Sequence, residues 1–218
     1  MNFSVSEPGK KYNYTTFGWT LISAVIESQL EKTSFGDAFQ KFIRVELGLR
    51  NTKLDENATI IPYRSKYYYL EKYKLKNCPS VDNSSKWAGG GLVSNINDLL
   101  QFGNLMLYSS VSGKLPGFFT KKQIDEMWSP LPVTIENGNL FGYGIGWVSV
   151  KNGSAKIAFG PEASFDNYAF HTGAAVGASS VLLIEPKNEI VVSIITNLQN
   201  VNGLVDSALE LAKEFSKS

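Results

Sequence analysis

The sequence predicts an α+β domain, with helices first, an antiparallel sheet second and a helix at the end. Three observations lead to this prediction. Apolar residues recur at helical spacing through much of residues 1–140, strand-like stretches joined by short turns follow from about Phe141, and residues 204–215 return to helical spacing. Helices separated from a run of antiparallel strands are typical of this class. The 218 residues are expected to form one domain, with a helical region over 1–140 and the sheet with its helix over 141–218.

The first expected helix follows Thr15 and Thr16, either of which can cap it, and covers residues 17–30. Its apolar stripe is broad, so we expect this helix to be packed on more than one side. A second helix is expected to start at Ser34 and to end near Gly48, because serine favours helix starts and glycine favours helix ends.

Residues 50–90 look loop-like and are rich in Tyr, Lys and Asn. Within them, the basic and aromatic stretch 63–76 could stack nucleic-acid bases, but a surface strand or loop is the simpler interpretation. A third helix is expected after Ser94. A fourth is expected after Thr120, where Gln123 completes a capping box.

Two hairpins are expected in the second half. Residues 142–150 and 155–159 flank Asn152-Gly153, a dipeptide that favours the tightest hairpin turns. A second hairpin should pair residues 179–185 with 189–196.

The stretch 190–195 is apolar on both faces apart from Ser193, which fits a strand with neighbours on both sides. The sequence offers an obvious partner on one side only. Either a partner chain donates another strand, or the chain lacks a segment that its fold expects. The tail 204–215 is amphipathic and should lie on the sheet.

The overall composition argues against several classes of protein. A net charge of +1 and a charged fraction of 19% do not fit a basic nucleic-acid binder or a disordered tail. No apolar run approaches the roughly 20 residues of a membrane helix. The start of the chain shows no targeting segment.

A single cysteine, Cys78, and a single histidine, His171, limit the chemistry further. They exclude an internal disulfide framework and fall short of a structural zinc set, so we expect neither a metal nor another cofactor. A Ser-His-Asp triad would need His171, but no Gly-x-Ser-x-Gly elbow is present. A Cys-His pair would need Cys78, which has no flanking protease signature and is more simply a half-buried thiol.

Four stretches stand out, in order along the chain: Tyr12-Asn13-Tyr14-Thr15-Thr16, Gly89-Gly90-Gly91-Leu92-Val93-Ser94, Gly142-Tyr143-Gly144-Ile145-Gly146-Trp147 and His171-Thr172-Gly173. They resemble motifs of the class C-like serine β-lactamases and penicillin-recognising peptidases. Each is weak alone, but four in this order across almost the whole chain are specific. Residues 81–91 and 171–183 are most similar to the mitochondrial branch of this family in animals. The resemblance implies a partial β-lactamase/transpeptidase-like fold and a mitochondrial location.

The resemblance also implies acyl transfer through a serine ester, on a peptide or small acyl substrate. Tyr14 would be the catalytic proton shuttle, with its pKa lowered by neighbouring cations. His171 would be the second catalytic residue, standing where the family has lysine and carrying a charge that is conditional near pH 7.

Four further residues would bind the substrate. Thr16 stands in the family's asparagine position and keeps only a hydroxyl in place of the amide. Thr172 would hydrogen-bond the substrate, Gly173 would let its backbone approach closely, and the N–H of Ala174 would form half of the oxyanion hole.

One family motif is absent. Ser-x-x-Lys supplies the nucleophile and its activating lysine, yet none of the lysines here follows a serine by three residues. The family places this motif upstream of the Tyr motif, so the chain resembles roughly the C-terminal half of the domain. Two hypotheses follow. The chain is a portion of a serine hydrolase of the peptidase type that is inert alone, or it is a non-catalytic scaffold or regulatory interaction protein that completes its sheet with another chain or by self-association.

Overall fold

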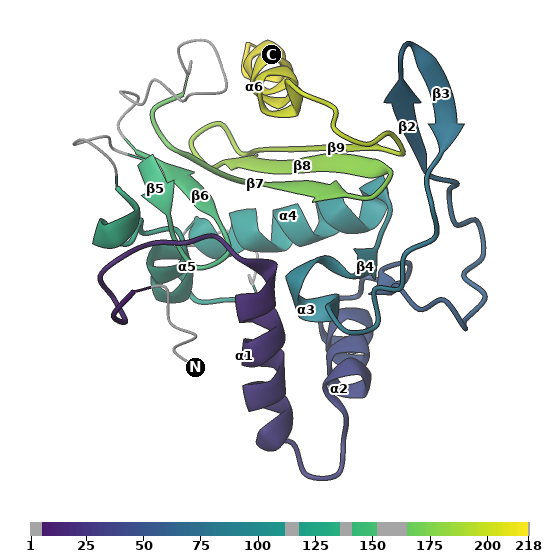
Figure 1. Ribbon diagram of the computed structural model, residues 1–218. Helices are drawn as coiled ribbons and strands as arrows, with labels where there is room; N and C mark the ends of the chain where they lie inside the picture. Colours follow the sequence, from purple (N-terminus) through teal and green to yellow (C-terminus); the bar gives the residue numbers. More distant parts are fainter. Residues whose placement is uncertain (1–5, 112–117, 136–140, 152–164, 218) are drawn as a thin grey trace.

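The computed structural model describes residues 6–111, 118–135, 141–151 and 165–217. It confirms the α+β prediction: an antiparallel sheet has helix α6 (Leu204–Phe215) on one face and helix α4 (Ile96–Ser110) on the other (Figure 1). The sheet follows chain order, β5-β6-β7-β8-β9. Its strands are β5 (Phe141–Tyr143), β6 (Val148–Val150), β7 (Tyr168–Ala175), β8 (Ala178–Glu185) and β9 (Ile190–Thr196).

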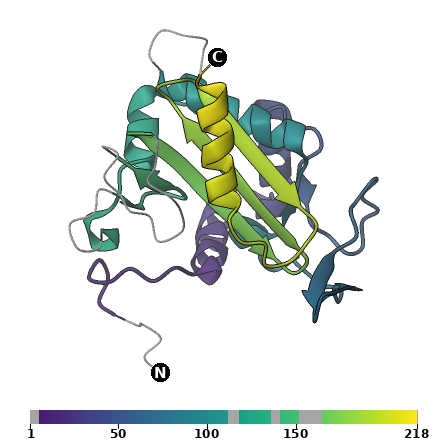
Figure 2. The same cartoon turned by 90° about the horizontal axis from the view of Figure 1, so that it is seen from above.

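Strand β8 joins the two hydrophobic cores. Val181 and Leu183 belong to the core beneath α6, whereas Leu182 and Ile184 belong to the core that α4 covers. Successive side chains of a strand point to opposite faces, so an apolar run is buried on both sides only when both faces are covered. Figure 2 shows α6 lying across the strands.

The last hairpin of the sheet and the helix that follows it match the sequence prediction closely. The hairpin of β8 and β9 forms as expected, with Glu185 opposite Ile190 at its turn. Helix α6 packs on β8 and β9 through its apolar side, including Val205 and Ala208. The predicted Asn152-Gly153 hairpin lies outside the described residues.

Helix α4 begins one residue later than the sequence suggested. Its N-cap is Asn95, whose side chain accepts a hydrogen bond from the Asp98 N–H. Gly103 lies in the middle of the helix because a Cβ there would come within 2.4 Å of Cγ1 of Val191. The glycine therefore lets α4 approach β9 closely, which offsets its low helix propensity.

Asp98 itself is a buried carboxylate that anchors an earlier loop to the start of α4. It is 4% exposed, and its Oδ2 accepts hydrogen bonds from the N–H of Asn51 at 2.8 Å and of Thr52 at 2.7 Å. The Thr52 hydroxyl donates to the same oxygen at 2.8 Å. Burial of a carboxylate is tolerated here because donors from residues nearly 50 positions away surround it.

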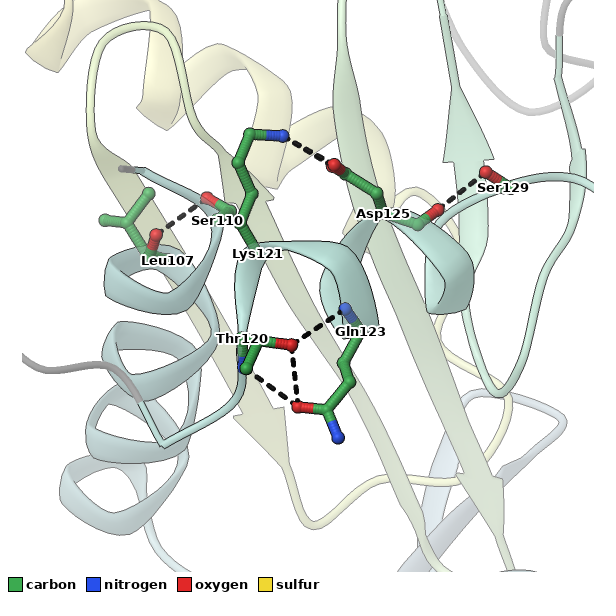
Figure 3. Close-up of polar contacts among 7 residues, drawn as sticks. All are labelled: Leu107, Ser110, Thr120, Lys121, Gln123, Asp125 and Ser129. Atoms are coloured by element: carbon green, nitrogen blue, oxygen red, sulfur yellow. Dashed lines mark hydrogen bonds and ion pairs between the residues drawn. The ribbon is translucent and has the colours of Figure 1, made fainter. Parts of the chain in front are cut away.

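Helix α5 (Lys121–Met127) has the capping box that the sequence predicted. The Thr120 side chain accepts from the Gln123 N–H, and the Gln123 side chain accepts from the Thr120 N–H (Figure 3). One turn along, Nζ of Lys121 lies 2.6 Å from Oδ2 of Asp125. Both ends of that ion pair are exposed, so we expect it to contribute little to stability.

Helix α1 (Thr16–Ser28) is capped by Thr15 as expected, but the prediction that it packs on more than one side is wrong. It contacts α2 (Phe35–Lys41) and the short α3 (Trp87–Gly90), and none of its residues is buried. Phe17 and Val25 are each 65% exposed. The apolar stripe is present in the sequence, but the described residues cover only part of it.

The second helix begins at the predicted cap and reaches the predicted end. Ser34 accepts a hydrogen bond from the Asp37 N–H, and α2 continues into a π-helical turn over Phe42–Glu46. Gly48 follows with φ +70°, a conformation that favours glycine and ends the helix.

Residues 50–90 contain more structure than their loop-like composition suggested, and the stretch 63–76 forms the surface strand that was one of its two interpretations. Strands β2 (Tyr68–Glu71) and β3 (Lys74–Asn77) form an exposed hairpin that projects from the body (Figure 1). Its base is attached to the segment after β9, because Tyr68 pairs with Leu198 and the Asn197 side chain donates to the Lys66 carbonyl. Shorter strands β1 (Lys53–Leu54) and β4 (Leu92–Val93) also pair.

Strand β9 has one strand neighbour, β8, among the described residues. From the sequence we expected a second strand at the other edge of β9, and no such strand is found in this part of the chain. The helices α4 and α6 cover the two faces instead. In the described ranges, no helix is long and apolar enough to cross a membrane.

The sandwich of α6, sheet and α4 predicts that Leu183→Ala lowers the free energy of unfolding by about 3 kcal/mol, because Leu183 is fully buried and its truncation leaves a cavity. Urea denaturation measures this change. The matched control is Leu75→Ala, on the exposed hairpin and 60% exposed, which should change stability by less than about 0.5 kcal/mol. Equal losses at both positions would contradict the assignment of the core.

The Asp98 cluster predicts a second difference in stability. Asp98→Asn replaces a carboxylate oxygen, which accepts hydrogen bonds, with an amide N–H₂, which donates them and so faces other donors. We expect this to lower the free energy of unfolding by about 2–3 kcal/mol. Asp37→Asn is the matched control, since Asp37 has the same position in the first turn of α2 but is exposed. If thermal and urea unfolding show no difference between the two variants, the Asp98 network does not stabilise the fold as described.

Candidate active site

Four aromatic side chains from three separate segments meet at one place. Tyr12 and Tyr14 precede α1, Tyr143 ends β5 and His171 lies on β7. The ring centroid of Tyr143 lies 5.6 Å from that of Tyr12, 5.8 Å from that of Tyr14 and 5.8 Å from that of His171. The rings of Tyr14 and His171 are 6.4 Å apart. The structure therefore brings together the two residues that the sequence singled out as catalytic.

The fold places these rings by local rules. Thr15 accepts a hydrogen bond from the Phe17 N–H at 3.2 Å, so α1 starts at Thr16, two residues after Tyr14. His171 is opposite Leu182 in the ladder of β7 and β8. The pairing of β6 with β7 ends one residue earlier, at Phe170, so β7 has no partner on that side from His171 onward among the described residues.

His171 makes two hydrogen bonds through its ring. Its Nδ1 lies 2.6 Å from the carbonyl oxygen of Thr172, and its Nε2 is hydrogen-bonded to the Tyr143 hydroxyl. Burial lowers the pKa of His171 below its usual value, and the Thr172 carbonyl opposes this change in part. The imidazole is therefore neutral at pH 7.

The phenols of Tyr143 and Tyr12 are also neutral. Burial raises the pKa of Tyr143, and the neighbouring Tyr14 and Tyr12 raise it further. Burial also raises the pKa of Tyr12, with a smaller contribution from Tyr14. Neutral phenols and imidazole can pass protons along hydrogen bonds without a change in net charge.

Thr16, the first substrate-binding candidate, lies against the glycine-rich segment. A Cβ on Gly89 would come within 2.6 Å of the Thr16 carbonyl oxygen, so only glycine fits there. Gly89 belongs to α3, which packs on α1. The glycine-rich stretch thus lies beside the start of α1.

The other three candidates continue β7 beyond His171. Thr172, Gly173 and Ala174 are exposed, and no described strand pairs with them on the side facing away from β8. Gly173 faces Ser180 across the ladder, where a Cβ would come within 2.3 Å of the Ser180 Oγ. This edge can accept an extended substrate backbone, the arrangement that β-strand addition uses.

Sequence reasoning did not assign site roles to Tyr12 and Tyr143. Both lie inside motifs that it had noted, but contact between these distant segments depends on the fold. Among the described residues, no three His, Cys, Asp or Glu side chains gather in a group that could hold a metal ion.

Solved structures confirm the fold. The octameric penicillin-binding protein homologue from Pyrococcus abyssi matches with a TM-score of 0.73 and 18% identity, over 99% of this chain and 45% of that one. A D-stereospecific amidohydrolase from Streptomyces sp. matches with a TM-score of 0.70 and 21% identity, over 97% of this chain and 56% of that one. At these identities the likeness concerns the fold.

Sequence comparison identifies the family. The chain is 39% identical over 234 aligned residues to the serine beta-lactamase-like protein LACTB, mitochondrial, of Homo sapiens, a match covering 97% of this chain and 42% of the relative. The Mus musculus protein of the same name is also 39% identical, with 41% of its length covered. The chain thus spans less than half the length of these relatives. A family model described as Beta-lactamase matches residues 4–216, and the chain belongs to the β-lactamase family.

Proposed function

We propose that this chain forms the tyrosine and histidine side of a serine acyl-transfer site, whose nucleophile comes from a Ser-x-x-Lys segment outside its sequence. The meeting of Tyr14 with His171 at the open edge of β7 carries this proposal. Membership of the β-lactamase family supports it. The names of the human and mouse relatives support a mitochondrial location.

In this proposal Tyr14 is the proton carrier. Tyr14 acts after its own proton has moved toward His171: as the serine oxygen bonds to the substrate carbonyl carbon, the Tyr14 phenolate takes the serine proton, and it returns this proton to the leaving group when the bond to that group breaks. Its hydroxyl can reach a substrate because the residue is 54% exposed. The N–H of Ala174 stabilises the developing oxyanion, while Thr16 and Thr172 orient the substrate, a peptide or small acyl compound.

Before any proton transfer, His171 is a neutral group beside Tyr14. The lysine that the family resemblance places here would carry a fixed positive charge, whereas a half-buried imidazole at pH 7 does not. A substrate carboxylate would therefore find no strong cation at His171. We propose that the site prefers an uncharged amide or ester group beside this residue.

A non-catalytic role is the alternative, and one observation favours it. Helix α1 exposes Phe17, Leu21 and Val25 along one face, which is the kind of apolar surface that binds other proteins. A scaffold protein that associates with itself or with another chain would keep the β7 edge but not require Tyr14 to act.

Labelling with a fluorophosphonate probe for activated serines separates the two proposals. The purified chain should not be labelled, because loss of the nucleophile typically lowers the rate about 10⁶-fold. Co-expression with a polypeptide that supplies the Ser-x-x-Lys segment implied by the family resemblance should restore labelling. Labelling of the chain alone would overturn the missing-nucleophile proposal.

In the reconstituted complex, Tyr14→Phe should reduce the rate of ester hydrolysis about 10²–10⁴-fold through loss of proton transfer. Tyr73→Phe is the matched control, because Tyr73 lies on the exposed hairpin turn and is 96% exposed. Equal rates for Tyr14→Phe and the control would leave the non-catalytic role as the better account.

The lowered pKa of His171 predicts a pH dependence of stability. The unfolded chain takes up a proton near the ordinary histidine pKa of about 6.5, while the folded chain resists protonation until a lower pH. Stability should therefore fall as the pH drops below about 6.5, and the loss should be complete below the folded pKa. Urea unfolding of wild type and His171→Gln, compared between pH 7.5 and 5, tests this, since the variant should lose that part of the dependence.

A further inference from the structure

The hydrogen bonds of His171 determine which ring nitrogen carries the proton. A backbone carbonyl only accepts hydrogen bonds, so the contact of Nδ1 with the Thr172 oxygen, at 2.6 Å, requires a proton on Nδ1. In the neutral ring Nε2 then holds a lone pair. The Tyr143 hydroxyl must therefore be the donor in its hydrogen bond with Nε2.

Tyr143 also connects His171 with Tyr14. Its ring lies 5.8 Å from each of the two, closer than the 6.4 Å that separates them from each other. Since its own proton points to Nε2, the Tyr143 oxygen has lone pairs left to accept the Tyr14 proton.

We propose that Tyr143 is a positioning residue that fixes His171 as the Nδ1–H tautomer and links it to Tyr14. The order of the hydrogen bonds is Tyr14 O–H to the Tyr143 oxygen, and Tyr143 O–H to Nε2 of His171. This inference deepens the proposed function and rests on it for the chemistry, whereas the tautomer assignment rests on geometry alone.

The arrangement lets Tyr14 release a proton without a neighbouring lysine. The Tyr14 proton moves to the Tyr143 oxygen while the Tyr143 proton moves to Nε2 of His171. The products are a Tyr14 phenolate, an intact Tyr143 phenol and a His171 imidazolium, so atoms and charge balance. The resulting ion pair then supplies the base that the proposed acyl transfer needs.

In the described part of the chain, the ionisable groups in ring contact with His171 or Tyr143 are Tyr14 and Tyr12, both from the segment before α1. Leu182 is the partner of His171 on β8. A change in the titration of His171 on removing the Tyr143 hydroxyl can therefore be ascribed to that hydroxyl.

The single histidine of the chain allows a direct test by ¹⁵N NMR of the histidine-labelled protein. Wild type should show a protonated Nδ1 and a hydrogen-bonded, unprotonated Nε2. In Tyr143→Phe the Nε2 signal should move to that of a nitrogen without a donor, and the titration midpoint of His171 should rise by about 1 pH unit, because a hydrogen bond that favours the neutral ring is lost.

Tyr168→Phe is the matched control, since Tyr168 is buried on the same strand but packs in the core beneath α6. Its spectrum should equal that of wild type. Identical His171 spectra in wild type and Tyr143→Phe, or a protonated Nε2 in wild type, would overturn the proposal.

A second readout separates this inference from the proposed function. In the reconstituted complex, Tyr143→Phe should lower kcat about 10-fold or more and shift its pH profile, with KM little changed. If no complex is active, the acyl-transfer proposal fails while the NMR result still decides the role of Tyr143. If activity is present but kcat and its pH profile are unchanged in Tyr143→Phe, the proton link is wrong.

Discussion

The alternation of side chains along β8 is the constraint on which the rest of the structure depends. Val181 and Leu183 enter one core, and Leu182 and Ile184 enter the other. A shift of one residue would exchange the two sets, so both cores oppose any slip. The fixed register of β8 holds β7 in place, and β7 in turn sets the position of His171 and of the exposed edge after it.

In the candidate site, the His171 side belongs to a paired strand, whereas the Tyr14 side is weakly packed. His171 belongs to a strand paired on both sides up to Phe170, whereas Tyr14 precedes a helix that has no buried residue. Tyr143 contacts both. The precision of the Tyr14 position therefore depends on aromatic contacts more than on the packing of α1, and preorganised positioning is what such chemistry requires.

The sequence predicted best what short-range chemistry decides. The caps at Ser34 and Thr120 were found because a cap and its partner lie within one turn. A surface strand was one interpretation of residues 63–76, but the turn of the β2–β3 hairpin was not predicted, because its residues Lys72 and Tyr73 adopt φ of 46° and 65° without the usual Asn or Gly.

Long-range contacts set the limit of sequence prediction. The apolar stripe of α1 was recognised, but the number of its neighbours depends on segments far away in the chain. The pairing of Tyr14 with His171 was available from family resemblance alone, since no local pattern relates residues so far apart. Tyr143 lay in a recognised motif, yet its hydrogen bond to His171 becomes visible only when β5 and β7 meet.

The attachment of the β2–β3 hairpin has a consequence for folding order. The hairpin base bonds to residues 197–199, more than 120 positions later, through the Asn197 and Gln199 backbones and the Cys78 thiol. Closing so large a loop is entropically costly, while β7, β8 and β9 are joined by short turns and can pair early. The sheet is therefore expected to form as a local nucleus, with the hairpin docking late and the Tyr14 segment ordered only after β5 and β7 have met.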